Sequence, residues 1–143
     1  MKIRKARKRN FKEIAKIYAE GFSEPPYNEN WTISKAIKKL KIFSKYCDMW
    51  EIIYEGKIVG FFVVNPHQWL IGESVFGEEM SIKKEFRNKG FAKEAFKLIF
   101  DYYKKKGYKD YFAVVLENSK SKKLHKSLGF EKCKNEFMWE KEL

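Results

Sequence analysis

The stretch Arg87-Asn88-Lys89-Gly90-Phe91-Ala92 decides how the rest of the chain is interpreted. It lies between a strand-like run that ends at Ile82 and an amphipathic helix pattern that begins near Lys89. The N-terminus of a helix presents unpaired backbone N–H groups and the positive end of the helix dipole, so it can bind an anion without a dedicated side chain. Gly90 would let the backbone approach that anion closely. The stretch therefore predicts a phosphate cradle over residues 87–92.

Two common phosphate-binding motifs do not fit this stretch. No Gly-Lys-Ser/Thr follows, as a P-loop requires, and the G-x-G-x-x-G spacing of a dinucleotide-binding turn is absent. The pattern R-x-x-G-x-A instead resembles the signature with which GCN5-related N-acetyltransferases (GNATs) bind the pyrophosphate of acetyl-CoA. Residues 78–86 resemble the family's fourth strand and the loop that follows it. The family's N-x-x-A-x-x-L-Y-x-x-x-G-F segment is matched in spacing by Asn118, Ser121, Leu124, His125 and Gly129-Phe130.

Length and composition limit the number of domains that the chain can form. A chain of 143 residues with 44% apolar residues is typical of one domain, so we expect a single domain over residues 1–143. No apolar stretch is long enough to cross a bilayer, and the N-terminus lacks the apolar core of a signal peptide. We expect a soluble cytoplasmic protein without a membrane partner. Cys47 and Cys133 lack metal-ligand spacing, so we expect no metal site.

The net charge of +12 has three interpretations: solubility, attraction to nucleic acid or a membrane, or attraction to a small polyanion. Only four of the 31 basic residues are arginines, the residue type best suited to bidentate recognition of bases and phosphates. The aromatic residues follow the periodicity of a core instead of alternating with lysines. We therefore expect no nucleic-acid partner, and a basic nucleic-acid-binding module is the least favoured alternative.

Hydrophobic periodicity predicts a mixed α/β (α+β) fold with the element order β-α-α-β-β-β-α-β-α-β-β. Asn10 is expected to cap the first helix and Gly21 to end it, and Thr32 or Ser34 to cap the second. The strands are expected at residues 2–6, 50–54, 57–65, 74–82 and 111–116, with a last hairpin around Lys134-Asn135, and the helices at 11–21, 33–43, 90–106 and 119–128. The resemblance implies a mostly antiparallel twisted sheet, flanked by about four helices, whose fourth and fifth strands splay apart beside the cradle.

The resemblance also implies how acetyl-CoA, the expected co-substrate, is held. The pantetheine arm would lie in the gap between the splayed strands and hydrogen-bond to an exposed strand edge. Asn118 would either cap the following helix or hold the pantetheine. The expected cofactor contacts are Met80, Ser81, Ile82, Arg87, Asn88, Lys89, Gly90, Phe91, Ala92 and Asn118.

Acetyl transfer to an amine needs a general base, and the acidic pair Glu78 and Glu79 supplies two candidates. Strand alternation would place the two side chains on opposite faces of the sheet, and we favour Glu78. Glu73 is a third choice. His125 stands where the family usually has the tyrosine that protonates the departing thiolate. An imidazolium can donate that proton, or water can supply it.

The acceptor is expected to be a small amine or a peptide amine. Residues 23–31 resemble a loop of aminoglycoside 6'-acetyltransferase-like GNATs, and acidic residues gather in the segments expected around the acceptor. Aromatic side chains there would suit a cationic amine. The expected substrate-binding residues are Glu24, Tyr27, Trp31 and Glu73. The sequence leaves open a monomer or a homodimer, and the missing tyrosine leaves open a catalytically weak CoA-binding regulator.

Overall fold

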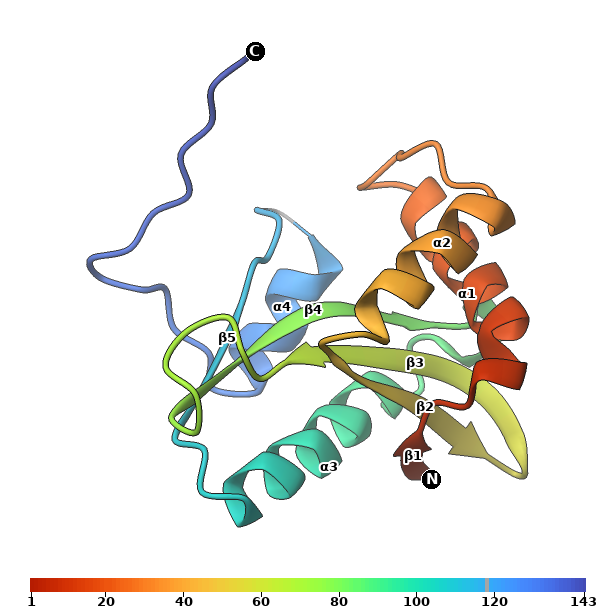
Figure 1. Ribbon diagram of the computed structural model, residues 1–143, viewed down its shortest axis with the longest axis horizontal. Coiled ribbons are helices and arrows are strands. Elements are labelled where there is room, and N and C mark those ends of the chain that lie inside the picture. The colour runs from red at the N-terminus through yellow and green to blue at the C-terminus, as the bar shows by residue number, and fades with distance from the viewer. Residues whose placement is uncertain (118) are drawn as a thin grey trace.

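A five-stranded sheet separates two layers of helices in the computed structural model, which describes residues 1–117 and 119–143 (Figure 1). The strands lie in the order β1-β2-β3-β4-β5. The elements are β1 (Lys2–Lys5), α1 (Phe11–Ser23), α2 (Ile33–Phe43), β2 (Asp48–Tyr54), β3 (Lys57–Asn65), β4 (Ser74–Ile82), α3 (Phe91–Lys105), β5 (Asp110–Ala113) and α4 (Lys120–Ser127). Helices α1 and α2 cover one face of the sheet, and α3 and α4 cover the other.

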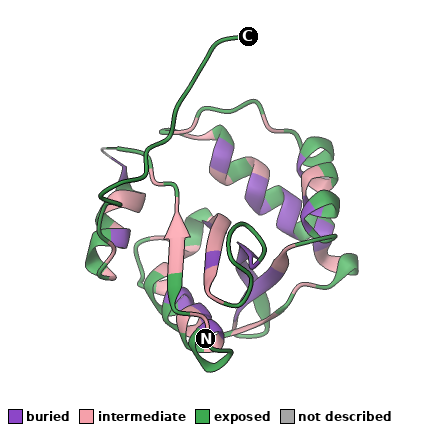
Figure 2. Cartoon of the chain, turned by 60° about the vertical axis from the view of Figure 1, so that its left-hand side comes forward, coloured by how far each residue is buried: buried purple, intermediate pink, exposed green. Residues whose placement is uncertain are grey.

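Strand β3 forms the centre of the core because both of its faces are covered. Phe61 and Val63 pack with α1 and α2, whereas Phe62 and Val64 pack on the α3 side. All four side chains are at most 1% exposed. A strand that is buried on both faces has a continuous apolar sequence instead of an alternating one, as residues 58–64 do. Figure 2 shows the buried residues of the flanking helices on the sides that face the sheet.

The predicted splay between the fourth and fifth strands is confirmed. β4 and β5 pair in parallel over four residues only, from Ser74↔Asp110 to Gly77↔Ala113. β4 then continues to Ile82 whereas β5 ends, so within the described residues the β5 side of residues 78–82 has no strand partner. The other neighbouring strands pair antiparallel. The open edge leads directly toward the start of α3.

Two expectations about α1 were wrong. Gly21 does not end the helix, which continues to Ser23. A Cβ atom at Gly21 would lie 2.3 Å from the Ser81 hydroxyl oxygen, so the glycine instead permits a close approach of α1 to β4. Asn10 stands at the N-cap but makes no capping hydrogen bond. Its Nδ2 instead donates to the fully buried Glu51 carboxylate at 2.6 Å. This hydrogen bond stabilises the fold more than a helix cap would, because a buried charge without partners is costly in free energy.

The cap of the second helix agrees with the expectation, whereas the last strands differ from it. Thr32, one of the two candidate caps, accepts a hydrogen bond from the Lys35 backbone N–H at 3.2 Å. β5 ends at Ala113 instead of Leu116. The hairpin around Lys134-Asn135 was wrong, since residues 131–143 are exposed and contain no strand in the described chain. That turn lacks the glycine that tight hairpins favour, and an isolated two-stranded hairpin is barely stable in water.

Candidate active site

The predicted phosphate cradle lies where β4 leads into α3. A short 3-10 helix, Lys84–Phe86, comes first, and Gly90 occupies the N-cap of α3. Asn88 and Gly90 both have left-handed backbones, with φ angles of 59° and 82°. Left-handed residues turn the backbone sharply, and the free N–H groups at the start of α3 lie at the positive end of the helix dipole. The segment can therefore hold an anion through its backbone.

Basic side chains surround the cradle, and two of them meet an unexpected partner. Arg87 Nε donates to the Ile82 carbonyl at 2.8 Å, and Arg87 Nη1 donates to the Glu24 carboxylate at 2.8 Å. Lys84 Nζ donates to the same carboxylate at 3.1 Å. These hydrogen bonds lower the pKa of Glu24. Glu24, expected to bind the acceptor amine, therefore lies against the cofactor cradle.

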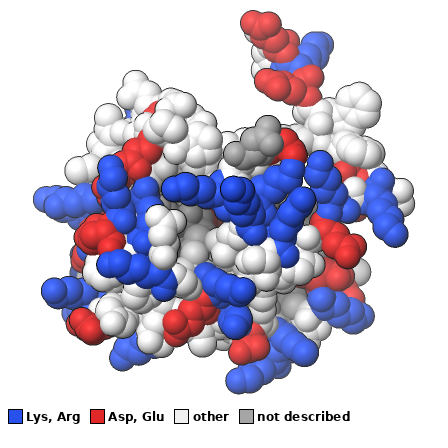
Figure 3. Space-filling view, turned by 180° about the vertical axis from the view of Figure 1, so that it is seen from behind, with Lys and Arg blue, Asp and Glu red and all other residues white. Residues whose placement is uncertain are grey.

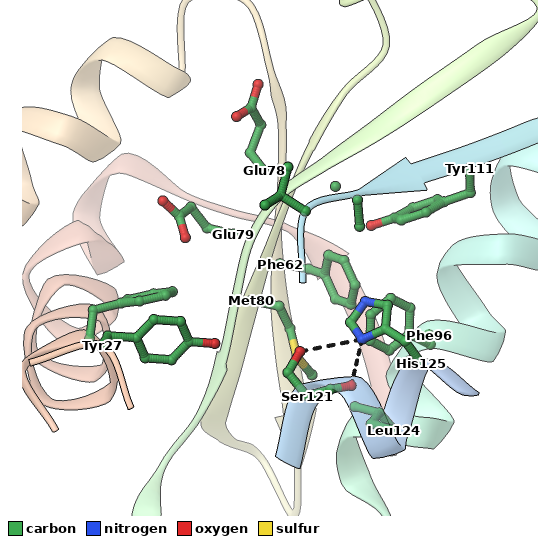
Figure 4. A pocket seen from close by; sticks show the side chains of 14 residues that line it. Tyr27, Phe62, Glu78, Glu79, Met80, Phe96, Tyr111, Ser121, Leu124 and His125 are labelled. Atoms are coloured by element: carbon green, nitrogen blue, oxygen red, sulfur yellow. Dashed lines mark hydrogen bonds between the residues drawn. The ribbon is translucent and has the colours of Figure 1, made fainter. Parts of the chain in front are cut away.

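A pocket of about 120 Å³ lies at the closed end of the gap between β4 and β5, where Gly77 and Ala113 form the last strand pair (Figure 4). It contains five of the residues predicted from the sequence, namely Tyr27, Glu78, Glu79, Met80 and His125. Its other lining residues are Phe22, Phe62, Gly77, Phe96, Tyr111, Ala113, Val114, Ser121 and Leu124. In Figure 4, Tyr27 and Glu79 lie on one side of β4 and His125 on the other.

The expected alternation of Glu78 and Glu79 was wrong because β4 is irregular at this point. Val63 pairs with Glu79, but the next residue of β3, Val64, pairs with Gly77. Glu78 is thus the extra residue of a β-bulge, which suspends the two-residue repeat of side-chain directions. Both glutamates line the same pocket as a result.

Glu79 has the more unusual environment of the two acids. Tyr18 on α1 donates its hydroxyl to Glu79 Oε1 at 2.8 Å. Burial raises the pKa of Glu79 to about 7, and the charges of Glu29 and Glu78 act in the same direction. The Tyr18 hydrogen bond and the Lys39 charge oppose that rise. Glu79 can therefore take up and release a proton near neutral pH.

Glu78 is held by hydrogen bonding instead. Asn65 Nδ2 donates to Glu78 Oε1 at 2.8 Å. The oxygen of the same amide group, Asn65 Oδ1, accepts the His67 backbone N–H at 2.9 Å, so the position of Asn65 is fixed by the turn after β3. This arrangement orients the Glu78 carboxylate at the edge of the pocket.

His125 is buried on α4, and one ring nitrogen is already engaged. Its Nδ1 lies 2.8 Å from the Ser121 carbonyl oxygen, which can only accept, so Nδ1 carries the proton of the neutral ring. The ring packs against Phe96 and Phe130, with centroids at 5.2 Å and 4.8 Å. Burial lowers the pKa of His125, and the Ser121 bond opposes this only in part. Near neutral pH the ring is therefore mostly uncharged, and Nε2 has no proton to donate.

The remaining predicted residues that the structure describes do not line the pocket. Trp31 packs edge-on against Tyr18 at 4.7 Å and donates its indole N–H to Glu29. Glu73 forms an ion pair with Lys109 at 2.6 Å and does not line the pocket. Ser81 and Ile82 are buried near the end of β4. Phe91 and Ala92 begin α3, and Asn118 lies outside the described residues.

The residues that the sequence interpretation missed include three polar side chains in or beside the pocket, those of Tyr18, Asn65 and Tyr111. Tyr18 belongs to the apolar stripe of α1, yet its hydroxyl needs a buried partner, and that requirement was the available signal. Asn65 precedes a proline at a strand end, which offers no hint of its bond to Glu78. Tyr111 reaches from β5 to β4, because a Cβ at Gly77 would lie 2.2 Å from the Tyr111 hydroxyl.

Comparison with known families agrees with this geometry. The family model described as the acetyltransferase (GNAT) family matches residues 8–130, which include the cradle and every lining residue of the pocket. The chain belongs to the acetyltransferase (GNAT) family. Family membership identifies acetyl-CoA as the co-substrate of this GNAT. No curated protein sequence matches the chain.

Solved structures show the same fold. A possible acetyltransferase from Clostridium difficile 630 is 21% identical over 99% of this chain and 97% of its own, with a TM-score of 0.83. The aminoglycoside 6'-N-acetyltransferase AAC(6')-IG from Acinetobacter haemolyticus is 15% identical over 100% of this chain and 99% of its own, with a TM-score of 0.75. AAC(6')-Iy in complex with a bisubstrate analogue is 20% identical over 99% of this chain and 98% of its own, with a TM-score of 0.70.

None of the helices described in this GNAT is long and apolar enough to span a bilayer. Within residues 1–117 and 119–143, no three His, Cys, Asp or Glu side chains are grouped as metal ligands. On the face seen in Figure 3, Lys and Arg side chains are spread widely, with Asp and Glu between them. This mixed distribution is typical of a solvated surface.

Replacing His125 with tyrosine is expected to raise kcat of this GNAT near pH 7.5, by up to about tenfold. The neutral imidazole has no proton to donate from Nε2, whereas a tyrosine hydroxyl stays protonated there and can serve the departing thiolate. The pH dependence of kcat measures the effect. His67→Tyr, on the exposed turn after β3, is the matched control. Two results together would assign the acid role to the imidazolium: a His125→Tyr variant slower than the unmodified protein, and activity of the unmodified protein that rises toward acidic pH.

Proposed function

We propose that this GNAT transfers an acetyl group directly from acetyl-CoA to a primary amine of a small molecule or a peptide. One observation carries the proposal. A carboxylate whose pKa lies at about 7, Glu79, lines a pocket at the closed end of the gap between β4 and β5, and the phosphate cradle lies at the other end of the same strand. Acetyl-CoA supplies the activated acyl group. The chain supplies the base, the positioning and the exclusion of water.

Glu79 is the proposed general base. A base works best when its pKa lies close to the working pH, and the pKa of Glu79 meets that condition. The amine would transfer its proton to Glu79, directly or through one water, as its nitrogen bonds to the acetyl carbon and the sulfur leaves as a thiolate. Tyr18 positions the carboxylate by donating to Oε1 and leaves the second oxygen available.

Backbone groups of β4 are the proposed donors to the acetyl carbonyl oxygen. Residues 78–82 have no strand partner on the β5 side in the described chain, and the bulge at Glu78 turns the backbone there. A fixed N–H group directed at a developing oxyanion stabilises it strongly where water is excluded. Met80 is the nearest residue whose backbone faces this edge: the Lys83 N–H donates to the Val59 carbonyl of β3 at 2.8 Å, and alternation along the antiparallel pair directs the Ser81 N–H to β3 as well.

A cationic amine is the proposed acceptor. Burial raises the pKa of the Tyr18 hydroxyl, and the charges of Glu79, Glu29 and Glu78 act in the same direction, so three carboxylates act on one small region. A protonated amine would be attracted there, and the Tyr27 ring could contact it. The structural neighbour AAC(6')-Iy, which was solved with the bisubstrate analogue CoA-S-monomethyl-acetylneamine, supports a small polyamine as one acceptor to test.

The test is an assay of free thiol release from acetyl-CoA with a panel of amines, in which the product is identified by mass spectrometry. The panel contains aminoglycosides, linear polyamines and peptides with a free N-terminus or lysine. We expect N-acetylated product with at least one class. The replacement of the family's tyrosine by His125 favours a second candidate, a CoA-binding regulator. Tight CoA binding without thiol release across the whole panel would support that candidate instead.

A further inference from the structure

Glu24 joins the segment between α1 and α2 to the cofactor cradle. Its carboxylate accepts hydrogen bonds from Arg87 at 2.8 Å and from Lys84 at 3.1 Å. It therefore pairs with both ends of the short segment that links β4 to the cradle. The Arg87 guanidinium is also fixed by β4, because its Nε donates to the Ile82 carbonyl. The cradle arginine is thus clamped between the end of β4 and the end of α1.

The segment that Glu24 holds also forms one wall of the candidate acceptor site. The backbone N–H groups of Tyr27 and Asn28 both donate to the Glu24 carbonyl at 3.1 Å, so the turn begins at Glu24 itself. Tyr27 lines the pocket three residues later. Its ring packs on Phe22 with centroids 5.0 Å apart. A displacement of Glu24 would therefore shift the wall that Tyr27 provides.

Residues 24–31 border the pocket through Tyr27. The pocket has a volume of about 120 Å³, less than the roughly 300 Å³ typical of sites that enclose small ligands. An outward shift of this wall would therefore enlarge the space for the acetyl-bearing end of the cofactor and an amine.

The charges at Glu24 supply a reason for that movement. Phosphate groups in the cradle would attract the same guanidinium and ammonium groups that Glu24 now neutralises. A carboxylate beside a phosphate is also repelled by it. An anion in the cradle therefore weakens the attachment of Glu24, and an attached Glu24 weakens anion binding by the same free energy.

We propose that Glu24 is a positioning residue that couples the two substrate sites: it holds the acceptor wall closed through Arg87 and Lys84 until the phosphates of acetyl-CoA displace it. The proposal rests on the proposed cradle at residues 87–92. Release of the wall by acetyl-CoA would favour entry of the amine, and binding of either substrate would favour binding of the other.

The test compares acetyl-CoA affinity by calorimetry in two variants that each remove one carboxylate from α1 or its end. Glu24→Gln is expected to bind acetyl-CoA about two- to fivefold more tightly, the range that a partly exposed ion pair provides. Glu13→Gln is the matched control, because Glu13 pairs with Lys83 at the same 2.8 Å but does not contact Arg87. It is expected to change the affinity by less than half as much. A merely structural role for Glu24 predicts unchanged or weaker binding.

A second measurement follows the wall itself. The amides of Tyr27 and Asn28 should exchange with deuterium faster in Glu24→Gln than in the unmodified protein, and faster in the unmodified protein once acetyl-CoA is bound. In an Arg87→Gln background the effect of Glu24→Gln on affinity should shrink. Equal affinities for the Glu24 and Glu13 variants would overturn the role of Glu24 and leave the cradle intact. Failure of the unmodified protein to bind acetyl-CoA would overturn the proposed function itself.

Discussion

Replacement of Glu79 by glutamine is expected to lower kcat at pH 7 by about 10²–10⁴-fold, the usual contribution of a general base. Glutamine has nearly the same shape and can still accept the Tyr18 hydroxyl bond, so the fold and acetyl-CoA affinity should change little. Activity should recover partly at higher pH, because the amine then loses its proton to solvent. The unmodified protein should lose activity as the pH falls below about 7, since protonation of Glu79 removes the base. A pH profile of kcat and kcat/KM for both proteins measures this.

Glu78→Gln is the matched control, since the two carboxylates are adjacent in the same bulge and line the same pocket. We expect it to reduce kcat by less than about tenfold and to leave the ascending limb of the pH profile in place. The reverse result, with the limb and the large rate loss both belonging to Glu78, would transfer the base to Glu78. A loss in Glu79→Gln that is equal at every pH would argue that Glu79 acts by binding or positioning the substrate and not as the base.

The choice between the two glutamates shows what the sequence could and could not predict. The strand at residues 74–82 was confirmed, and so was its role at the edge of the splay. The bulge at Glu78 depends on how β4 pairs with β3, and nothing in the local sequence marks it. Strict alternation led us to expect only one of the two glutamates at the acceptor, and from the sequence we favoured Glu78. The partner that distinguishes Glu79 is Tyr18, which lies 61 residues away along the chain.

The charged residues outside the strand also have partners that the local sequence does not indicate. Segment by segment, Glu24 and Glu73 look like acids of an acceptor site. In the folded chain Glu24 pairs with Arg87, 63 residues away, and Glu73 pairs with Lys109. Composition identifies which charges a segment carries, but the partner of each charge depends on which loops the topology brings together. The proposed cradle depends instead on backbone conformation within six consecutive residues, which a local sequence pattern can indicate.

Replacement of Gly90 by valine is expected to weaken acetyl-CoA binding about tenfold or more. Gly90 has a φ of 82°, which a β-branched residue adopts only at a considerable cost in free energy, on the order of 1–2 kcal/mol or more. In the described part of the chain, no heavy atom lies within 4 Å of a Cβ at this position, so the added side chain has space and the strain lies in the backbone. Relief of that strain would turn the N–H groups at the start of α3 away from the bound phosphates.

Gly107→Val provides the matched control for this last variant. Gly107 lies just beyond the other end of α3 with a φ of 89°, and a Cβ there also has no described neighbour within 4 Å. The two substitutions should lower the melting temperature by similar amounts, because they impose the same backbone strain at exposed positions of one helix. Only Gly90→Val should weaken acetyl-CoA binding in calorimetry. Unchanged affinity in a folded Gly90→Val protein would show that the cradle does not hold the phosphates through its backbone, whereas equal losses in both variants would trace the effect to the stability of α3.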